Sequence, residues 1–187
     1  MKKRTIALLC AAMMVVGVAA GGTMAWLVDI TQVKENVFTV GNIDITLEET
    51  TESYKMIPGK DIAKDPKVTL SAESEDAYIY VEVIESGNLT SYIDYGMNTG
   101  WVELTGEYYA PNGGTIYKYT GNVTKGVAIS VLLGDKVKTL DSVTNEMMTE
   151  AETNQPKLTF YGYAIQKEGF QSAEAAWNGN FQLPTEP

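Results

Sequence analysis

The chain has 187 residues, a length that suits one domain with short appendages. It carries 14 basic and 24 acidic residues, and its only basic cluster, residues 2–4, lies at the N-terminus. Without residues 1–25 the net charge would be 11 − 24 = −13. Because Lys and Arg supply most of the affinity of proteins for phosphates, this balance argues against nucleic acid as a partner.

Histidine is absent, and Cys10 is the only cysteine. This composition excludes the HExxH zinc motif and the Ser-His-Asp and Cys-His catalytic arrangements. If the segment that contains Cys10 is removed, no thiol remains for a disulfide or a metal site. We therefore expect neither a cofactor nor enzyme activity.

Residues 1–25 have the form of a secretory signal peptide. A basic end precedes fifteen uncharged apolar residues, 6–20. Thr23 and Ala25 place small side chains three residues and one residue before a cut between Ala25 and Trp26, which we predict as the cleavage site. An uncleaved membrane anchor stays the alternative, because continuing the apolar run beyond Trp26 would reach the roughly 20 residues that a spanning helix needs.

Alternation of apolar and polar residues predicts seven or eight short β-strands beyond residue 36. We expect them at 37–48 with a bulge at Gly41, then at 76–85, 101–104, 107–110, 115–120, 127–133 and 157–165.

The predicted strand 76–85 has a clear apolar face. Four aliphatic residues alternate with polar ones, which predicts one buried and one solvated face. The buried set is Ala77, Ile79, Val81 and Val83, and the solvated set is Tyr78, Tyr80 and Glu82.

Turn and helix signals complete the pattern. Pro58-Gly59 and residues 111–114 predict turns, and two short helices are expected at 140–152, capped by Asp141 or Ser142, and at 172–179, capped by Ser172 and stopped by Gly179. The predicted fold is an all-β, jelly-roll-like antiparallel β-sandwich with short helical inserts over residues 37–180. A signal peptide and a segment 26–36 precede it, and a flexible tail, 181–187, follows.

Three blocks of sequence resemble a known family. They are "GGTMAWLVDITQVKENVFTVGNIDITLEE" at 21–49, "MIPGKDIAKDPKVTL" at 56–70 and "GYAIQKEGFQSAEAAW" at 162–177. They are similar to the SipW-dependent secreted proteins of Gram-positive bacteria, the TasA and camelysin (CalY) family.

The resemblance implies export, processing by a SipW-type signal peptidase, and a structural role in a biofilm matrix or surface fibre. It also implies that subunits join to copies of themselves or to related matrix subunits by donating a strand. Residues 26–36 are the candidate donor strand, since Trp26, Val28 and Ile30 form one apolar edge. Two alternatives stay open, because the segment could instead pack within its own chain as a first strand or form a disordered leader.

Two other groups of residues suggest binding functions. The carboxylates Glu48, Glu49, Glu52, Asp61, Asp65, Glu73, Glu75 and Asp76 do not follow the order of an EF-hand, and we interpret them as solvated rather than metal-binding. The aromatic residues Trp101, Tyr108, Tyr109, Tyr117 and Tyr119 could form a sugar-binding face. The alternative function is therefore a monomeric secreted or surface-anchored module that binds a glycan or a host protein, and a metalloprotease activity, as some camelysin-like proteins are labelled, is not expected.

Overall fold

The computed structural model describes residues 42–50 and 54–181, which all belong to one compact unit, Gly41–Pro187. The predicted signal peptide, the cleavage site at Ala25 and Trp26, the candidate donor strand and the bulge at Gly41 lie outside the described residues. So do the last six residues of the predicted tail. In the part of the chain that is described, no helix is long and apolar enough to cross a membrane.

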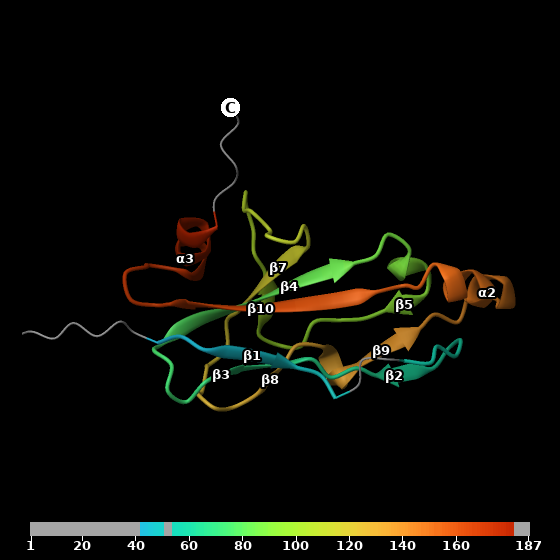
Figure 1. Cartoon of the computed structure of the whole chain (residues 1–187), viewed down its shortest axis with the longest axis horizontal. Helices are drawn as coiled ribbons and strands as arrows, with labels where there is room; N and C mark the ends of the chain where they lie inside the picture. The colour runs from blue at the N-terminus through green and yellow to red at the C-terminus, as the bar shows by residue number, and fades with distance from the viewer. Residues whose placement is uncertain (1–41, 51–53, 182–187) are drawn as a thin grey trace, which may run out of the picture. The chain divides into compact units, whose positions relative to one another are not determined.

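The described residues form three antiparallel sheets (Figure 1), each named here by its central strand. The β3 sheet has the order β1 (Ile45–Glu48), β3 (Lys67–Leu70) and β8 (Ile129–Ser130). The β4 sheet has the order β10 (Leu158–Gln166), β4 (Ala77–Glu85), β7 (Thr115–Tyr119) and β6 (Trp101–Glu103). The β9 sheet has the order β2 (Asp61–Ala63), β9 (Lys136–Thr139) and β5 (Ile93–Asp94). This arrangement confirms the predicted all-β sandwich.

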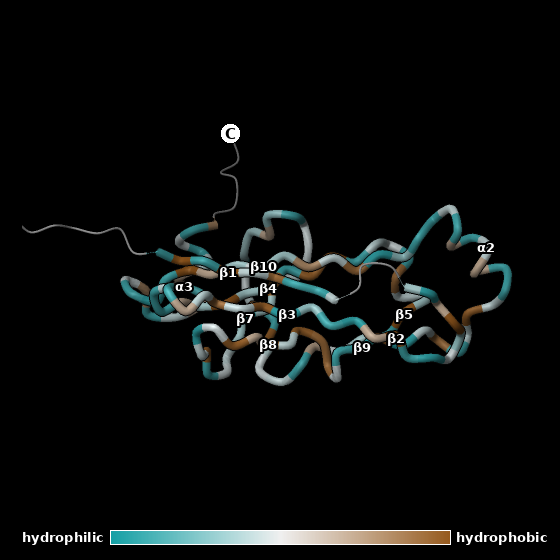
Figure 2. Tube along the Cα trace, turned by 60° about the horizontal axis from the view of Figure 1, so that its bottom comes forward, coloured by the Kyte–Doolittle hydropathy of each residue, from teal (hydrophilic) through white to brown (hydrophobic). Residues whose placement is uncertain are grey.

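The main core lies between the β3 sheet and the β4 sheet. Val68 and Leu70 of β3 and Ile79 and Val81 of β4 are at most 1% exposed and belong to one hydrophobic cluster. Because side chains alternate between the faces of a strand, these residues all point into the same interior. Figure 2 shows the pattern, since brown hydrophobic segments are interspersed with teal hydrophilic ones along the strands.

The outer face of β4 is buried too, which corrects the prediction of a solvated face. Tyr80 and Glu82 are both 0% exposed. Helix α3 (Ala173–Asn180) covers this face (Figure 1), and the Trp177 ring lies 4.9 Å from the ring of Tyr80. The Tyr80 hydroxyl donates a 2.7 Å hydrogen bond to the carbonyl of Ala173. Alternation identifies the apolar face of a strand, but it cannot show whether a later helix covers the polar face.

Both predicted helices are present, with corrected ends. Helix α2 (Asn145–Thr153) is capped by Thr144, whose hydroxyl accepts from the Met147 amide, and not by Asp141 or Ser142. The Asp141 carboxylate instead pairs with Lys138 at 2.8 Å.

Helix α3 begins at the predicted cap, Ser172, whose hydroxyl accepts from the Ala175 amide. Gly179 does not stop it, because the helix continues to Asn180. The ring of the following residue, Phe181, packs 4.4 Å from the Trp177 ring and holds the last turn in place.

Several strand predictions were wrong in extent. Residues 107–110 form a loop rather than a strand. The carbonyl of Tyr109 bonds to a side chain and not to a neighbouring strand, since it accepts a 3.0 Å hydrogen bond from the Trp177 indole. The predicted strand 127–133 contains only β8, and Val127 and Leu133 are more than half exposed. The remaining short elements were not predicted, namely β2, β5, β9 and the 3-10 turns η1 (Leu89–Ser91) and η2 (Leu133–Asp135).

Candidate assembly edge

One side of the sandwich is closed by hydrogen bonds between its two sheets. The indole of Trp101, the first residue of β6, donates a 2.9 Å hydrogen bond to the carbonyl of Ser130 in β8. The Asn98 amide donates to the carbonyl of Val131 at 2.8 Å. The first bond joins the last strand of the β4 sheet to the last strand of the β3 sheet, and the second joins residues beside these strands, so hydrogen bonds close this side of the sandwich.

The opposite side is open. Strand β1 ends the β3 sheet and β10 ends the β4 sheet, and among the described residues no strand pairs with the outer edge of either one. The two edges lie against each other, because the position of a Cβ on Gly162 of β10 is 3.5 Å from the Cβ of Leu47 in β1. Ile45, Leu47 and Phe160 pack against the core but are only partly buried. An unpaired edge with a partly covered apolar interior is suited to accept an added strand.

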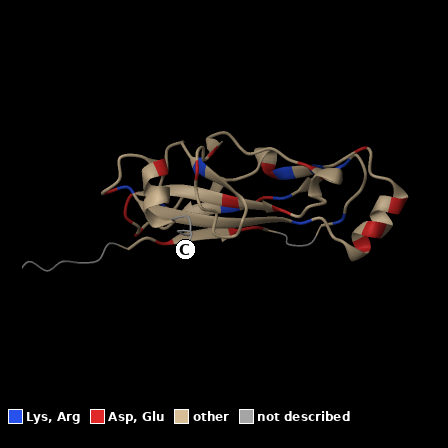
Figure 3. Ribbon diagram, turned by 90° about the horizontal axis from the view of Figure 1, so that it is seen from above, with Lys and Arg blue, Asp and Glu red and all other residues tan. Residues whose placement is uncertain are grey.

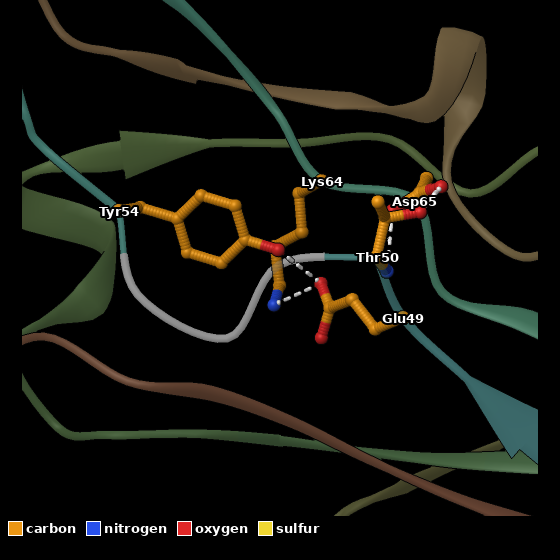
Figure 4. A network of polar contacts seen from close by, with 5 residues as sticks. All are labelled: Glu49, Thr50, Tyr54, Lys64 and Asp65. Atoms are coloured by element: carbon orange, nitrogen blue, oxygen red, sulfur yellow. Dashed lines mark hydrogen bonds and ion pairs between the residues drawn. The ribbon is translucent and has the colours of Figure 1, made fainter.

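A group of polar side chains, which we call the clasp, lies at one end of this open side (Figure 4). Its members are Glu49, Thr50, Tyr54, Lys64 and Asp65. Lys64 is only 8% exposed, and its ammonium lies 2.7 Å from Oε1 of Glu49. The Tyr54 hydroxyl donates to the same oxygen at 2.7 Å.

The clasp continues the contact between these two segments beyond the end of the β1–β3 ladder. The last paired residues are Glu48 and Lys67, and beyond them the Thr50 amide bonds to a side chain rather than to a backbone carbonyl. Asp65 takes over, since its carboxylate accepts from the Thr50 amide at 3.0 Å and from the Thr50 hydroxyl at 2.6 Å. These hydrogen bonds lower the pKa of Asp65. The side chain of Lys64 extends inward, and its ammonium lies 5.4 Å from the centroid of the Phe160 ring on β10.

The predicted acidic residues do not all gather at one site, since only Glu49 and Asp65 belong to the clasp, and Figure 3 shows Asp and Glu, in red, spread over several elements. Those with cationic partners pair separately, as Glu49 with Lys64, Asp61 with Lys136, Asp65 with Lys67 and Asp76 with Lys125. Within residues 42–50 and 54–181, no three His, Cys, Asp or Glu side chains form a group that could hold a metal ion. Glu52 lies outside the described residues.

The five predicted sugar-binding aromatic residues do not share a face. Trp101 is only 6% exposed and packs in the core between the sheets, together with Tyr117 and Tyr119. Tyr108 belongs to the separate cluster under α3. Tyr117 of β7 lies opposite the inward-facing Val81 of β4, and Tyr119, two residues further on, has the same parity. No continuous aromatic surface results from these residues.

Glu82 is a buried acid whose surroundings were not anticipated. Its Oε1 accepts from the amides of Asn112 and Gly114, both at 2.9 Å, and its Oε2 accepts from the Asn112 side chain at 2.9 Å and from Tyr163 at 2.8 Å. Burial raises the pKa of Glu82, but these hydrogen bonds lower it more, and the net pKa is below the usual value. Because all four donors are satisfied within the protein, Glu82 fixes the turn at 111–114 rather than forming an open site.

Together the described residues define an all-β sandwich with one side closed by hydrogen bonds, whereas on the other side the outer edges of β1 and β10 pair with no described strand. The model of one protein family, described as camelysin metallo-endopeptidase, matches residues 1–75, a range that includes β1, β2 and β3. Over these residues the match confirms the predicted assignment to the TasA and camelysin family. No curated protein and no solved structure matches the chain.

The family description implies a metal centre, and the residues present do not fit one. Zinc in peptidases is held mainly by histidine with a carboxylate, and the chain has no histidine. The described carboxylates that face inward already have partners. Glu49 pairs with Lys64, and Glu82 accepts four hydrogen bonds. We therefore derive no metal-dependent step for this chain.

Proposed function

We propose that the protein is a secreted, non-enzymatic subunit of an extracellular matrix or surface fibre. In this proposal each subunit donates its N-terminal segment, led by Trp26, Val28 and Ile30, to the open side of the next subunit. The observation that supports it best is the asymmetry of the sandwich, since one side is joined by Trp101 and Ser130 while the outer edges of β1 and β10 pair with no strand of the described residues.

Strand addition suits these surfaces physically. Backbone hydrogen bonds satisfy the free edge, and alternate apolar side chains cover the partly buried Ile45, Leu47 and Phe160. Burying the three apolar donor residues would contribute about 1.5–3 kcal/mol each before the cost of association. The donor and acceptor surfaces differ, so contacts repeat head to tail and extend into a filament.

Processing and location are part of the same proposal. A SipW-type signal peptidase would cut between Ala25 and Trp26, and the mature protein would act outside the cell or at its surface. The uncleaved, membrane-anchored form is the alternative, and N-terminal sequencing of the protein recovered outside the cell separates the two.

Electron microscopy of two purified proteins tests the assembly. Protein beginning at Trp26 should form filaments, and protein beginning at Asn36 should stay monomeric because it lacks the donor segment. Val28→Asp should also prevent filaments, since it places a charge in the apolar interior. Leu27→Asp is the matched control, because Leu27 alternates to the opposite face. Equal polymerisation of the Trp26 and Asn36 proteins would refute strand donation.

A further inference from the structure

Among the described residues, side chains lie across one end of the open side, where a donated strand would have to stop. At the end near Phe160 of β10, the Lys64 ammonium lies both beside Glu49, which directly follows β1, and near the Phe160 ring, and Tyr54 bonds to the same Glu49 oxygen. The other end is where residues 42 and 43 lead into β1. We infer that the clasp is a stop that sets the direction and register of the donated strand on β1. This inference rests on the proposed function.

The direction follows from which end of the donor is free. The mature chain would begin at Trp26, whereas at its other end the segment must continue into the body of its own subunit. Only the free N-terminus of the donated segment can therefore lie against the clasp. A strand that starts at the clasp runs from Glu49 toward Ile43, which is antiparallel to β1 and parallel to β10. Antiparallel pairing is the slightly more stable arrangement and continues the antiparallel β3 sheet, so β1 is the accepting edge.

The register follows from hydrophobicity. Side chains that alternate along β1 place Ile45 and Leu47 inward and leave Thr46 and Glu48 exposed. A slip of one residue would expose the whole apolar edge of the donor. Only registers that differ by two residues therefore remain.

Charge selects one of these registers. When Val28 lies opposite Leu47, Ile30 lies opposite Ile45 and Asp29 lies opposite Thr46. A shift of two residues in one direction places Asp29 opposite Asp44, and the same shift in the other direction places it opposite Glu48. Like charges directly opposite each other destabilise a strand pair, so the register with Asp29 at Thr46 is favoured.

This register places the new N-terminus beside Glu49. Trp26 then lies opposite Glu49, and its α-ammonium meets a carboxylate that is only 17% exposed. Lys64 and Tyr54 both contact Oε1 of Glu49, so Oε2 is the acceptor for the added cation. A charge-assisted hydrogen bond in a partly buried site is among the stronger polar contacts.

Engineered disulfides test the register directly, because the mature chain contains no cysteine. Cross-strand neighbours are close enough to be linked. Oxidised filaments of Asp29→Cys/Thr46→Cys protein should give a ladder of covalent oligomers on a non-reducing gel. Asp29→Cys/Asp44→Cys protein reports the shifted register, and Asp29→Cys/Tyr161→Cys protein reports pairing with β10. A ladder from either of these two proteins, without one from the first, would overturn the inference.

Monomeric disulfide products from the first protein would show that the segment pairs with its own β1, and this outcome too would overturn the inference. Filaments with the wrong linkage would leave the proposed function intact. Wild-type protein that forms no filaments would instead refute the proposed function and the inference together.

Substitution of the stop provides a second readout. Glu49→Gln should raise the critical concentration for assembly by roughly tenfold, which corresponds to the loss of about 1.4 kcal/mol. Glu48→Gln is the matched control, since Glu48 is adjacent, exposed and on the other face of β1. Urea unfolding of both monomers shows whether either change alters folding. Equal critical concentrations for the two variants would contradict a role for Glu49.

Discussion

Replacement of Glu82 by Gln should destabilise the protein because it removes a buried charge that four donors share. The carboxylate oxygens accept from two backbone amides, the Asn112 side chain and the Tyr163 hydroxyl, at 2.8–2.9 Å. A glutamine can keep its oxygen toward the two backbone amides. Its NH₂ group then faces two donors and cannot accept from them. Hydrogen bonds to charged groups contribute about 1.5–3 kcal/mol each, so losing one or two should lower the free energy of unfolding by about 2–5 kcal/mol at pH 7.

The effect should depend on pH in a defined direction. The pKa of Glu82 is lower in the folded protein than in the unfolded chain. The contribution of its carboxylate to the free energy of unfolding is therefore full above the unfolded pKa of about 4.3, and it is lost as the pH falls through the folded pKa. Urea unfolding followed by tryptophan fluorescence at pH 7 and pH 3 measures both free energies. The difference in the free energy of unfolding between wild type and Glu82→Gln should be smaller at pH 3 than at pH 7. Glu103→Gln, on an exposed side chain of β6, is the control. A gap below 0.5 kcal/mol at pH 7, or one that does not change with pH, would refute the reasoning.

Three further predictions concern the outer layer, the turn and the chemistry. Trp177→Ala should lower the free energy of unfolding by about 3–5 kcal/mol in urea titrations, since Trp177 is 0% exposed, whereas Tyr161→Ala at a 43% exposed position should cost far less. Gly114→Ala should lower the melting temperature, because its Cβ would lie 2.5 Å from a strand carbonyl, and Gly87→Ala should not, because nothing lies within 4 Å. Mature protein with added Zn²⁺ should hydrolyse labelled casein no faster than buffer, and chelator-sensitive hydrolysis would contradict the non-enzymatic proposal.

The long elements were predictable because their patterns are long. Strands β4 and β10, nine residues each, contain enough alternation to be recognised, and the helix that begins after Ser172 has a cap and helix-forming residues. The turn at Pro58-Gly59 was predicted from its residue types, and Gly59 has a φ of +72°.

The missed elements owe their existence to tertiary pairing. Strands β2 and β5 have three and two residues, too few for periodicity to appear, and both pair with β9. The burial of Glu82 depends on Asn112 and Gly114, 30 and 32 residues away, and on Tyr163, 81 residues away. No local pattern indicates such partners.

The open side could not be recognised from sequence for the same reason. An edge is defined by the absence of a neighbour, and this depends on the order of strands within a sheet rather than on the composition of β1 or β10. The clasp gave no local signal, since Glu49 and Thr50 lie 15 residues from their partners Lys64 and Asp65. Which side chains continue the contact becomes clear only when these two segments lie side by side.

A cryo-electron microscopy reconstruction of filaments formed by protein beginning at Trp26 tests the central claim most directly. The account predicts that residues 26–30 of each subunit lie along β1 of the next subunit, with Val28 opposite Leu47 and the N-terminus at Glu49. Density that places this segment on β1 of its own subunit, or filaments held together by other surfaces, would contradict it.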